Sequence, residues 1–154
     1  RDDRFVLVDA GSRNGTFIKI RGETPLRAGD VILAGKQLLR YERDDSLGRS
    51  MLTALLHSGA TGESYPLANE ATTIGRTSAD IIFDGDPTMA ETHAVVARRD
   101  GGYVVSDLGS KNGTFLRVKE EVELEESDII IFGRHIFRFE LSYYEDDYAT
   151  LKGF

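Results

Sequence analysis

The chain contains the same nine-residue pattern twice, and this repeat limits its possible folds more than any other feature. Residues 9–17 and 107–115 both read Asp-x-Gly-Ser-(Arg/Lys)-Asn-Gly-Thr-Phe, at an offset of 98 positions. The same offset continues without a gap over roughly 38 residues, setting Asp30 and Gly35 against Asp128 and Gly133. Solenoid repeats are about 20 to 50 residues long, so a repeat of this length indicates two copies of one domain.

The two copies differ in length. The first begins almost at residue 1, whereas the second has about 50 further residues ahead of its matching part. We therefore expect residues 1–44 to be the C-terminal half of a first domain, residues 45–51 a linker, and residues 52–142 a complete second domain. Residues 143–154 form an acidic, tyrosine-rich tail. A half-domain leaves apolar residues that need a cover from missing strands, the second domain or another molecule: Phe5, Leu7, Phe17, Ile32, Leu33 and Leu39.

Short β-branched or aromatic runs, separated by Gly, Asp and Ser, predict strands throughout the chain. In the first copy they cover residues 5–8, 16–20, 31–33 and 37–41. The second copy adds runs at 51–56, 65–67, 72–74, 80–83, 94–97 and 103–105 before the series repeats. Strands at about ten-residue spacing, without a helical period, predict an all-β fold, a two-layer antiparallel β-sandwich.

Composition argues against several classes of function. The chain has no cysteine and three scattered histidines, so we expect no disulfide, no metal site and no cofactor. Residues 51–142 carry a net charge of −7, which would repel a nucleic acid backbone. No apolar run approaches the ~20 residues that span a bilayer, and no secretory leader is recognisable. We expect a cytoplasmic protein with neither nucleic acid nor membrane as partner.

The repeated Gly-Ser-(Arg/Lys)-Asn-Gly-Thr segment has two interpretations. Asn-Gly favours a tight turn between two strands, which would give the segment a purely structural role. Alternatively, the loop offers a hydroxyl, a cation and an amide in succession, from Ser110, Lys111 and Asn112 in the second copy. This trio suits a phosphorylated peptide, with Ser110 or Lys111 toward the phosphate and Asn112 toward the peptide backbone. The first copy presents Ser12, Arg13 and Asn14 in the same order.

Further motifs of the second copy occur in a fixed order: Ile74-Gly75-Arg76, Asp80–Phe83, Thr92-His93-Ala94, then Asp107–Phe115. With this order and spacing the chain resembles the forkhead-associated (FHA) domain, a β-sandwich that binds phosphothreonine peptides. The resemblance is complete over 52–142 and covers 1–44 as a C-terminal half. It implies that Arg76 contacts phosphate, that His93 is structural and that Asn112 holds the peptide backbone. Gly75 and Gly113 would shape the same loops.

The chain departs from the family at its Ser-x-x-His motif. The position of the phosphate-binding serine is Ala90, and Glu91 follows it where the family often has a basic or polar residue. Loss of a hydrogen bond to a charged group costs about 1.5–3 kcal/mol. A carboxylate ~7 Å from a phosphate adds on the order of 1–4 kcal/mol of repulsion. We expect a weakened pocket, in which Thr92 is the nearby hydroxyl that could substitute in part.

Two other features have simple alternatives. His93 lacks a nucleophile nearby in sequence, so a buried, hydrogen-bonded histidine fits better than a catalytic base. Asp84-Gly85-Asp86 lacks the spacing of a calcium loop and is better interpreted as a turn.

The sequence therefore predicts a phosphothreonine-peptide recognition module for signalling, without enzymatic activity. Its partner would be a phosphorylated protein or peptide. A phosphate-independent docking or self-assembly domain, with an unphosphorylated protein partner, is the first alternative. The second is an adaptor region of a larger signalling enzyme such as a kinase or cyclase. By the offset of 98, the first copy's equivalents of Arg76 and His93 would lie ahead of residue 1. The first copy, in less acidic surroundings, is the better candidate for a working site once completed.

Overall fold

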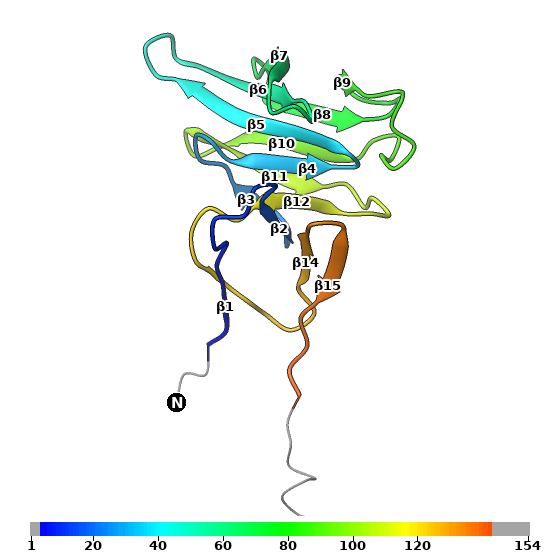
Figure 1. The fold of residues 1–154 in the computed structure, drawn as a ribbon. Coiled ribbons are helices and arrows are strands. Elements are labelled where there is room, and N and C mark those ends of the chain that lie inside the picture. The colour runs from blue at the N-terminus through cyan, green and yellow to red at the C-terminus, as the bar shows by residue number, and fades with distance from the viewer. Residues whose placement is uncertain (1–3, 143–154) are drawn as a thin grey trace, which may run out of the picture.

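A computed structural model describes residues 4–142 of the chain, and the predicted tail lies outside them. Every regular element in this range is a strand (Figure 1). The strands are β1 Val6–Leu7, β2 Thr16–Lys19, β3 Thr24–Pro25, β4 Val31–Ala34, β5 Gln37–Asp44, β6 Arg49–Leu55, β7 Thr61–Pro66, β8 Ala71–Gly75, β9 Ile81–Ile82, β10 Ala94–Arg99, β11 Gly102–Asp107, β12 Thr114–Arg117, β13 Val122–Glu123, β14 Ile129–Phe132 and β15 His135–Arg138.

The strands form two large sheets and one small pair. One sheet has the order β3-β11-β10-β8-β9, the other the order β15-β14-β2-β12-β4-β5-β6-β7, and β1 pairs with β13. All pairings are antiparallel apart from β8 with β9. The predicted all-β antiparallel sandwich is confirmed, with the parallel pair β8–β9 as an exception within residues 4–142. No helix among the described residues has the length and apolar character needed to cross a membrane.

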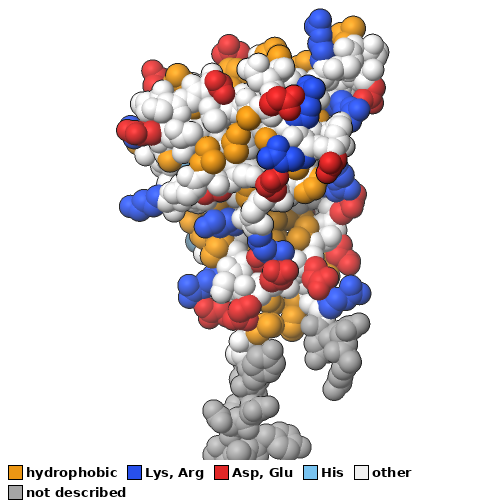
Figure 2. Space-filling view, turned by 180° about the vertical axis from the view of Figure 1, so that it is seen from behind, with side chains coloured by type: hydrophobic (Ala, Val, Ile, Leu, Met, Phe, Trp, Pro, Cys, Tyr) orange, Lys and Arg blue, Asp and Glu red, His pale blue; other side chains and the backbone are white. Residues whose placement is uncertain are grey.

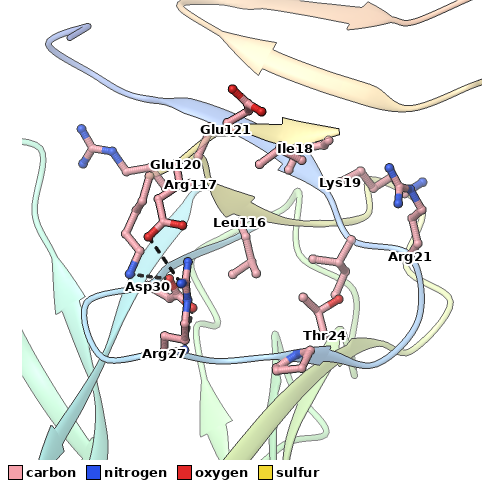
Figure 3. Close-up of a pocket in the computed structure, with 15 residues that line it drawn as sticks. Ile18, Lys19, Arg21, Thr24, Arg27, Asp30, Leu116, Arg117, Glu120 and Glu121 are labelled. Carbon is pink, nitrogen blue, oxygen red and sulfur yellow. Dashed lines mark hydrogen bonds and ion pairs between the residues drawn. The ribbon is translucent and has the colours of Figure 1, made fainter. Parts of the chain in front are cut away.

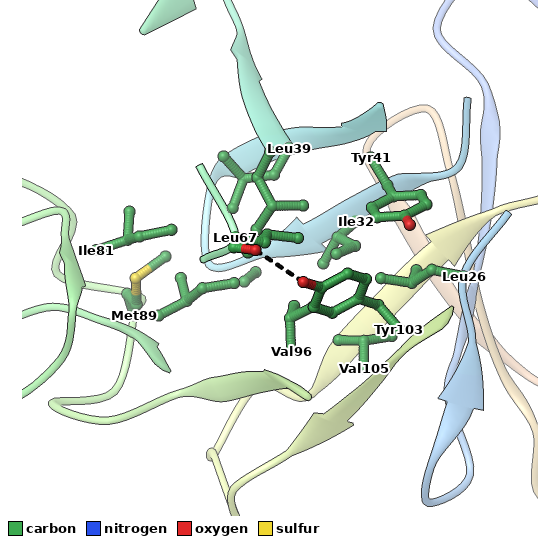
Figure 4. Close-up of a cluster of buried hydrophobic side chains, with 13 residues drawn as sticks. Leu26, Ile32, Leu39, Tyr41, Leu67, Ile81, Met89, Val96, Tyr103 and Val105 are labelled. Carbon is green, nitrogen blue, oxygen red and sulfur yellow. Dashed lines mark hydrogen bonds between the residues drawn. The ribbon is translucent and has the colours of Figure 1, made fainter. Parts of the chain in front are cut away.

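The main core lies between the two large sheets (Figure 4). Ile32, Leu39 and Leu52 from the eight-stranded sheet are fully buried against residues such as Val96 and Val105 from the five-stranded sheet. The ring of Tyr103 lies in this core and its hydroxyl donates to the Leu67 carbonyl at 2.7 Å, so burial leaves the polar atom paired. Of the first-copy residues expected to need a cover, Ile32 and Leu39 obtain it from strands of the second copy.

The two copies exchange strands, which the sequence did not suggest. In a self-contained second domain, β12 would pair with the hairpin of its own copy, β14–β15. Instead β12 pairs with β4 of the first copy, and β5 of the same hairpin pairs with β6 over seven residue pairs. The second copy's hairpin pairs with β2 of the first copy and lies below the main sandwich in Figure 1. Residues 52–142 therefore do not close a sandwich by themselves, and residues 24–44 complete it.

The exchange is symmetric about the pair Ile18↔Leu116, two residues related by the offset of 98. The pairings that β2, β3 and β4 make with the second copy have mates at the equivalent residues, whereas the pairing of β5 with β6 has none among residues 4–142. Phe115↔Leu33 corresponds to Ile131↔Phe17, and Val104↔Pro25 corresponds to Val6↔Glu123. This is the self-complementary arrangement of a two-fold interface, here within one chain.

Two ion pairs between the copies are related by the same symmetry. Lys119 Nζ lies 2.8 Å from the Asp30 carboxylate, and the equivalent Arg21 makes a two-point contact with Asp128, at 2.8 and 2.6 Å. The Arg21 guanidinium lowers the pKa of Asp128. Arg21, Asp30 and Lys119 line a pocket of about 350 Å³ between the two crossing connections, and Arg27 and Glu120 form an ion pair beside it (Figure 3).

The segment expected to be a linker is instead the turn of a hairpin. Residues 45–48 connect β5 to β6, and Asp44 pairs with Arg49 across them. Asp44 accepts hydrogen bonds from the backbone and hydroxyl of Ser46, which stabilises the turn. This hairpin joins the first copy to the second through continuous strand pairing.

Candidate functional site

The loops that carry the candidate site residues meet at one end of the main sandwich. Arg76 follows β8, and its backbone N–H donates to the Ala90 carbonyl at 2.9 Å. Its Nε donates to the carbonyl of Met89 at 3.1 Å, while Asn112 Nδ2 donates to the neighbouring carbonyl of Thr88 at 2.8 Å. The arginine and the asparagine therefore contact adjacent residues of one loop, although 36 positions separate them in the sequence.

His93 connects the two recognition loops from the inside. Its ring is fully buried, Nδ1 accepts the Ala90 backbone N–H at 3.0 Å, and Nε2 lies 2.8 Å from the Gly113 carbonyl. Because Nδ1 accepts, the proton belongs on Nε2, which donates to Gly113. Both ring nitrogens are then hydrogen-bonded to the backbone. It fixes the loop before β10 relative to the loop before β12.

The loop of Ser110, Lys111 and Asn112 is held by Asp107. Burial raises the pKa of Asp107, but hydrogen bonds from Ser110 and Thr114 outweigh it and the pKa is lowered. The Ser110 hydroxyl donates to Asp107 and accepts the Gly113 N–H at 2.9 Å. Its proton is thus committed to the loop, which leaves the exposed Lys111 and Asn112 side chains as the outward-facing groups.

The first copy builds its loop in the same way. Ser12 donates from both its backbone and its hydroxyl to Asp9, each at 2.9 Å, and the Gly15 N–H donates to the Ser12 hydroxyl at 3.1 Å. Arg13 and Asn14 are exposed.

Gly75 is required by a close approach of two backbones. A Cβ atom at this position would lie 2.1 Å from the carbonyl oxygen of Glu91, far inside van der Waals contact. The approach lets Glu91 accept backbone N–H groups of Thr77 and Ser78, at 3.3 and 3.0 Å. Gly75 thereby keeps Arg76 against the loop that contains the altered Ser-x-x-His motif.

The three residues around that alteration differ in their surroundings. Ala90 is half-buried, and the Glu91 side chain is exposed. The Thr92 hydroxyl donates to the Ser78 carbonyl at 2.6 Å, so it can still accept a hydrogen bond but has no proton left to give.

Sequence reasoning missed Asp86, which the structure makes a central anchor. This carboxylate is 3% exposed and accepts the Lys36 backbone N–H at 2.7 Å and the Gln37 amide at 3.1 Å. Its other oxygen accepts the backbone and hydroxyl of Thr88. Burial raises the pKa of Asp86, but the bonds from Thr88, Lys36 and Gln37 prevail and lower it to about 2. Asp86 thus joins the first copy's hairpin turn to the recognition loop.

The exchanged hairpin consequently brings a cation to the site. Lys36 and Lys19 from the first copy line the same pocket as Thr88 and Asn112. The pocket has a mainly apolar floor of Leu33, Phe115, Ile129, Ile131 and Ile136. The sequence alone could not have identified Lys36. If the second copy used its own hairpin, the equivalent residue at the offset of 98, Arg134, would occupy this position. Within residues 4–142 no cluster of acidic or histidine side chains suits a metal ion.

Residues 72–133 match the model of the FHA domain family. The transcriptional regulatory protein EmbR of Mycobacterium tuberculosis is 38% identical over 120 residues, which cover 75% of this chain and 30% of EmbR. The oxoglutarate dehydrogenase inhibitor of Corynebacterium diphtheriae is 40% identical over 55 residues, covering 36% of this chain and 38% of that protein.

A solved structure of M. tuberculosis EmbR in complex with a low affinity phosphopeptide is 31% identical in sequence. The match covers 57% of this chain and 27% of that one, with a TM-score of 0.32. The chain spans about 30% of the length of the EmbR relatives it matches.

Proposed function

We propose that the chain recognises phosphothreonine peptides as a signalling interaction module, through the loops at one end of the main sandwich. The observation that carries this proposal is the placement of Arg76 and Asn112 on the adjacent carbonyls of Met89 and Thr88. Arg76 offers a cation for the phosphate and Asn112 an amide for the peptide backbone, and both side chains are anchored on neighbouring residues of one loop. The FHA match over residues 72–133 supports the same function.

The charges available at the site suit a dianion bound at the surface. Among the described residues no protein group is hydrogen-bonded to the two terminal nitrogens of Arg76, so both can donate to phosphate. Lys111 is exposed beside Asn112, and Lys36 of the first copy lies on the same pocket as Asn112. The binding site in this proposal is composite, because the exchanged hairpin contributes one of its cations.

Ala90 and Glu91 weaken the site. Ala90 supplies no hydroxyl, Glu91 adds a negative charge and the Thr92 proton is already used. We therefore expect an affinity in the upper micromolar to millimolar range, on the order of −4 to −6 kcal/mol of binding free energy.

The double variant Ala90→Ser/Glu91→Arg should bind a phosphothreonine peptide at least tenfold more tightly than the natural chain. Each tenfold step needs only ~1.4 kcal/mol, which is less than the sum of the two effects it reverses. Isothermal titration calorimetry with one phosphopeptide measures the change. The matched control is Ala60→Ser/Glu63→Arg, with Ala60 just before β7 and Glu63 on it, both exposed, which makes the same change in composition and charge away from the recognition loops. Equal gains in both variants would mean that bulk charge, and not the pocket, controls binding.

A peptide array tests the function itself. The chain is incubated with a degenerate phosphothreonine library and with the same library carrying threonine or phosphoserine. Binding that requires phosphothreonine, and that Arg76→Ala abolishes, supports the proposal. Equal binding to phosphorylated and unphosphorylated libraries would favour phosphate-independent docking instead.

A further inference from the structure

The pocket that contains Asn112 lies on the outer face of the eight-stranded sheet. Residues opposite each other on neighbouring strands point to the same face, and successive residues of a strand point to opposite faces. Phe115 pairs with both Lys19 and Leu33, so these three side chains share a face. Ile32, the neighbour of Leu33, is buried in the main core on the other face. The pocket, of about 280 Å³, is therefore separate from the core and continuous with the recognition loops.

Strands of both copies build this pocket because of the exchange. Leu33 comes from the first copy's hairpin, whereas Ile129, Ile131 and Ile136 come from the second copy's hairpin, β14–β15. We call these three isoleucines the isoleucine wall. Ile131 pairs with Ile136, so both side chains lie on the same face. A self-contained second domain would use β14–β15 in place of β4–β5, and it could not supply both sides of the pocket.

The Lys19 side chain lies across the recognition loop at Gly113. A Cβ atom at Gly113 would lie 2.7 Å from Lys19 Cε, so the aliphatic part of the lysine occupies the space beside the glycine. Arg117, the equivalent of Lys19 in the repeat, lies in the same way over Gly15. Each of these two loops is therefore covered by a cationic side chain from the other copy. Lys19 also lines the pocket that contains Asn112, and Arg117 does not.

Two lysines of this pocket have no acidic partner in the described part of the chain. No carboxylate of residues 4–142 lies within ion-pair distance of Lys19 or Lys36, whereas Lys119 pairs with Asp30 at 2.8 Å. Positive and negative side chains are interspersed on the face of the molecule shown in Figure 2. At the pocket, by contrast, the described lining residues include both lysines and no acidic residue. The pocket therefore favours a ligand that carries a negative charge beside an apolar group.

We propose that a bound phosphothreonine peptide continues from the recognition loops onto the outer face of the sheet. There an aliphatic residue of the peptide packs on the isoleucine wall, and an acidic residue pairs with Lys19 and Lys36. This inference rests on the proposed function, because Asn112 must hold the peptide for its neighbouring residues to reach the pocket. Lys19 and Ile136 are then specificity determinants supplied by different copies.

The size of the pocket agrees with this ligand. Pockets that enclose a whole organic ligand are about 300–1,000 Å³. A pocket of about 280 Å³ beside the recognition loops suits peptide side chains better than a separate ligand.

A phosphothreonine library, in which one position at a time is fixed as Leu, Asp, Ala or Lys, measures the preference of the unaltered chain. We expect enrichment of Leu at one position and of Asp near it, on the same side of the phosphothreonine. One peptide that carries both residues, and two versions with either the Leu or the Asp replaced by Ala, then serve as probes. Titrations followed by NMR measure their affinities, including weak ones.

Ile136→Ser should weaken binding of the peptide with both residues by about tenfold, because an apolar contact is lost. It should not change the affinity of the peptide that lacks Leu. The matched control is Phe137→Ser. Phe137 is the next residue of β15 and is also exposed, but it does not line the pocket. Since both side chains are exposed, we expect both variants to fold.

Lys19→Met keeps the length of the side chain and removes its charge. It should weaken binding of the peptide with both residues about threefold to fivefold, as expected for a partly exposed ion pair, and leave the peptide that lacks Asp unaffected. Lys19→Arg should retain the affinity. The matched control is Arg117→Met at the equivalent position of the repeat, which should change none of the affinities.

The outcomes separate this inference from the proposed function. Binding that requires phosphothreonine but shows no preference at any other position would overturn the inference and leave the function intact. Equal effects of each variant and its control would do the same. Absence of phosphothreonine-dependent binding for every peptide would overturn the proposed function, and the inference with it.

Discussion

Leu39→Ala is expected to lower the free energy of unfolding by about 2–5 kcal/mol, whereas Phe137→Ala should cost about 1 kcal/mol or less. The two residues are equivalent in the repeat, and Phe137 is the larger side chain. Leu39, however, lies fully buried between the two sheets. Phe137 is 45% exposed, and its ring stacks on that of Phe132 with 4.5 Å between the ring centroids. Truncation of Leu39 leaves a cavity, and truncation of Phe137 mainly removes a surface contact.

Urea unfolding of the two variants and the unaltered chain measures the difference. Leu38→Ala and Ile136→Ala form a second equivalent pair, with Leu38 half-buried and Ile136 70% exposed, and should show a smaller difference in the same direction. If Phe137→Ala destabilised the protein as much as Leu39→Ala, the exchanged arrangement would be wrong, since each hairpin would then have an equally buried core face.

The second large effect is expected for Asp86→Asn, which should destabilise the chain by about 2 kcal/mol at neutral pH and far less in acid. The pKa of this carboxyl falls from 3.8 to about 2 on folding. A folded pKa below the unfolded one contributes stability above the unfolded pKa, and this contribution is lost as pH falls through the folded pKa. In the asparagine variant, an –NH₂ group replaces one of the two oxygens that accept these hydrogen bonds. That group is itself a donor, so the bonds on its side are lost.

Thermal unfolding of the unaltered chain and of Asp86→Asn at pH 7 and near pH 2 gives the required comparison. The gap between the two proteins should narrow as the carboxyl protonates. Asp84→Asn, an exposed carboxyl two positions earlier, is the control and should change little at either pH. An equal gap at both pH values would mean that Asp86 does not act as a charged acceptor.

Much of the fold could be predicted because it depends on local pattern. Strand runs and the Asp-x-Gly-Ser-x-Asn-Gly loops follow from residue type and turn chemistry, and the loops of both copies have the hydrogen bonds expected of such turns. The exchange of hairpins could not be predicted, because local pattern is the same in both hairpins. Residues 31–44 and 129–142 share one pattern, so sequence alone cannot say which of them completes a given sandwich. The choice depends on contacts between residues far apart in the chain, such as Asp86 with Lys36.

The candidate site divides in a similar way. Arg76, His93 and Asn112 belong to motifs that sequence can identify, and the structure brings them to neighbouring loops. Asp86 and Lys36 lie outside those motifs, because their roles arise only when the first copy's hairpin docks on the recognition loop. Of the two residues expected to lie toward the phosphate, Ser110 and Lys111, the Ser110 hydroxyl donates to Asp107, as Ser12 does to Asp9 in the first copy.

The most direct test of phosphopeptide recognition is a titration of the isotopically labelled chain with one phosphothreonine peptide, followed by NMR. The account predicts phosphate-dependent shifts that cluster at Gly75–Ser78, Thr88–Thr92 and Ser110–Gly113, together with Lys36 of the first copy. Arg134, the equivalent of Lys36 in the repeat, should shift less than Lys36, because Lys36 lines the pocket that contains Asn112 and Arg134 does not. Shifts of the same size with the unphosphorylated peptide, or shifts at Arg134 in place of Lys36, would contradict it.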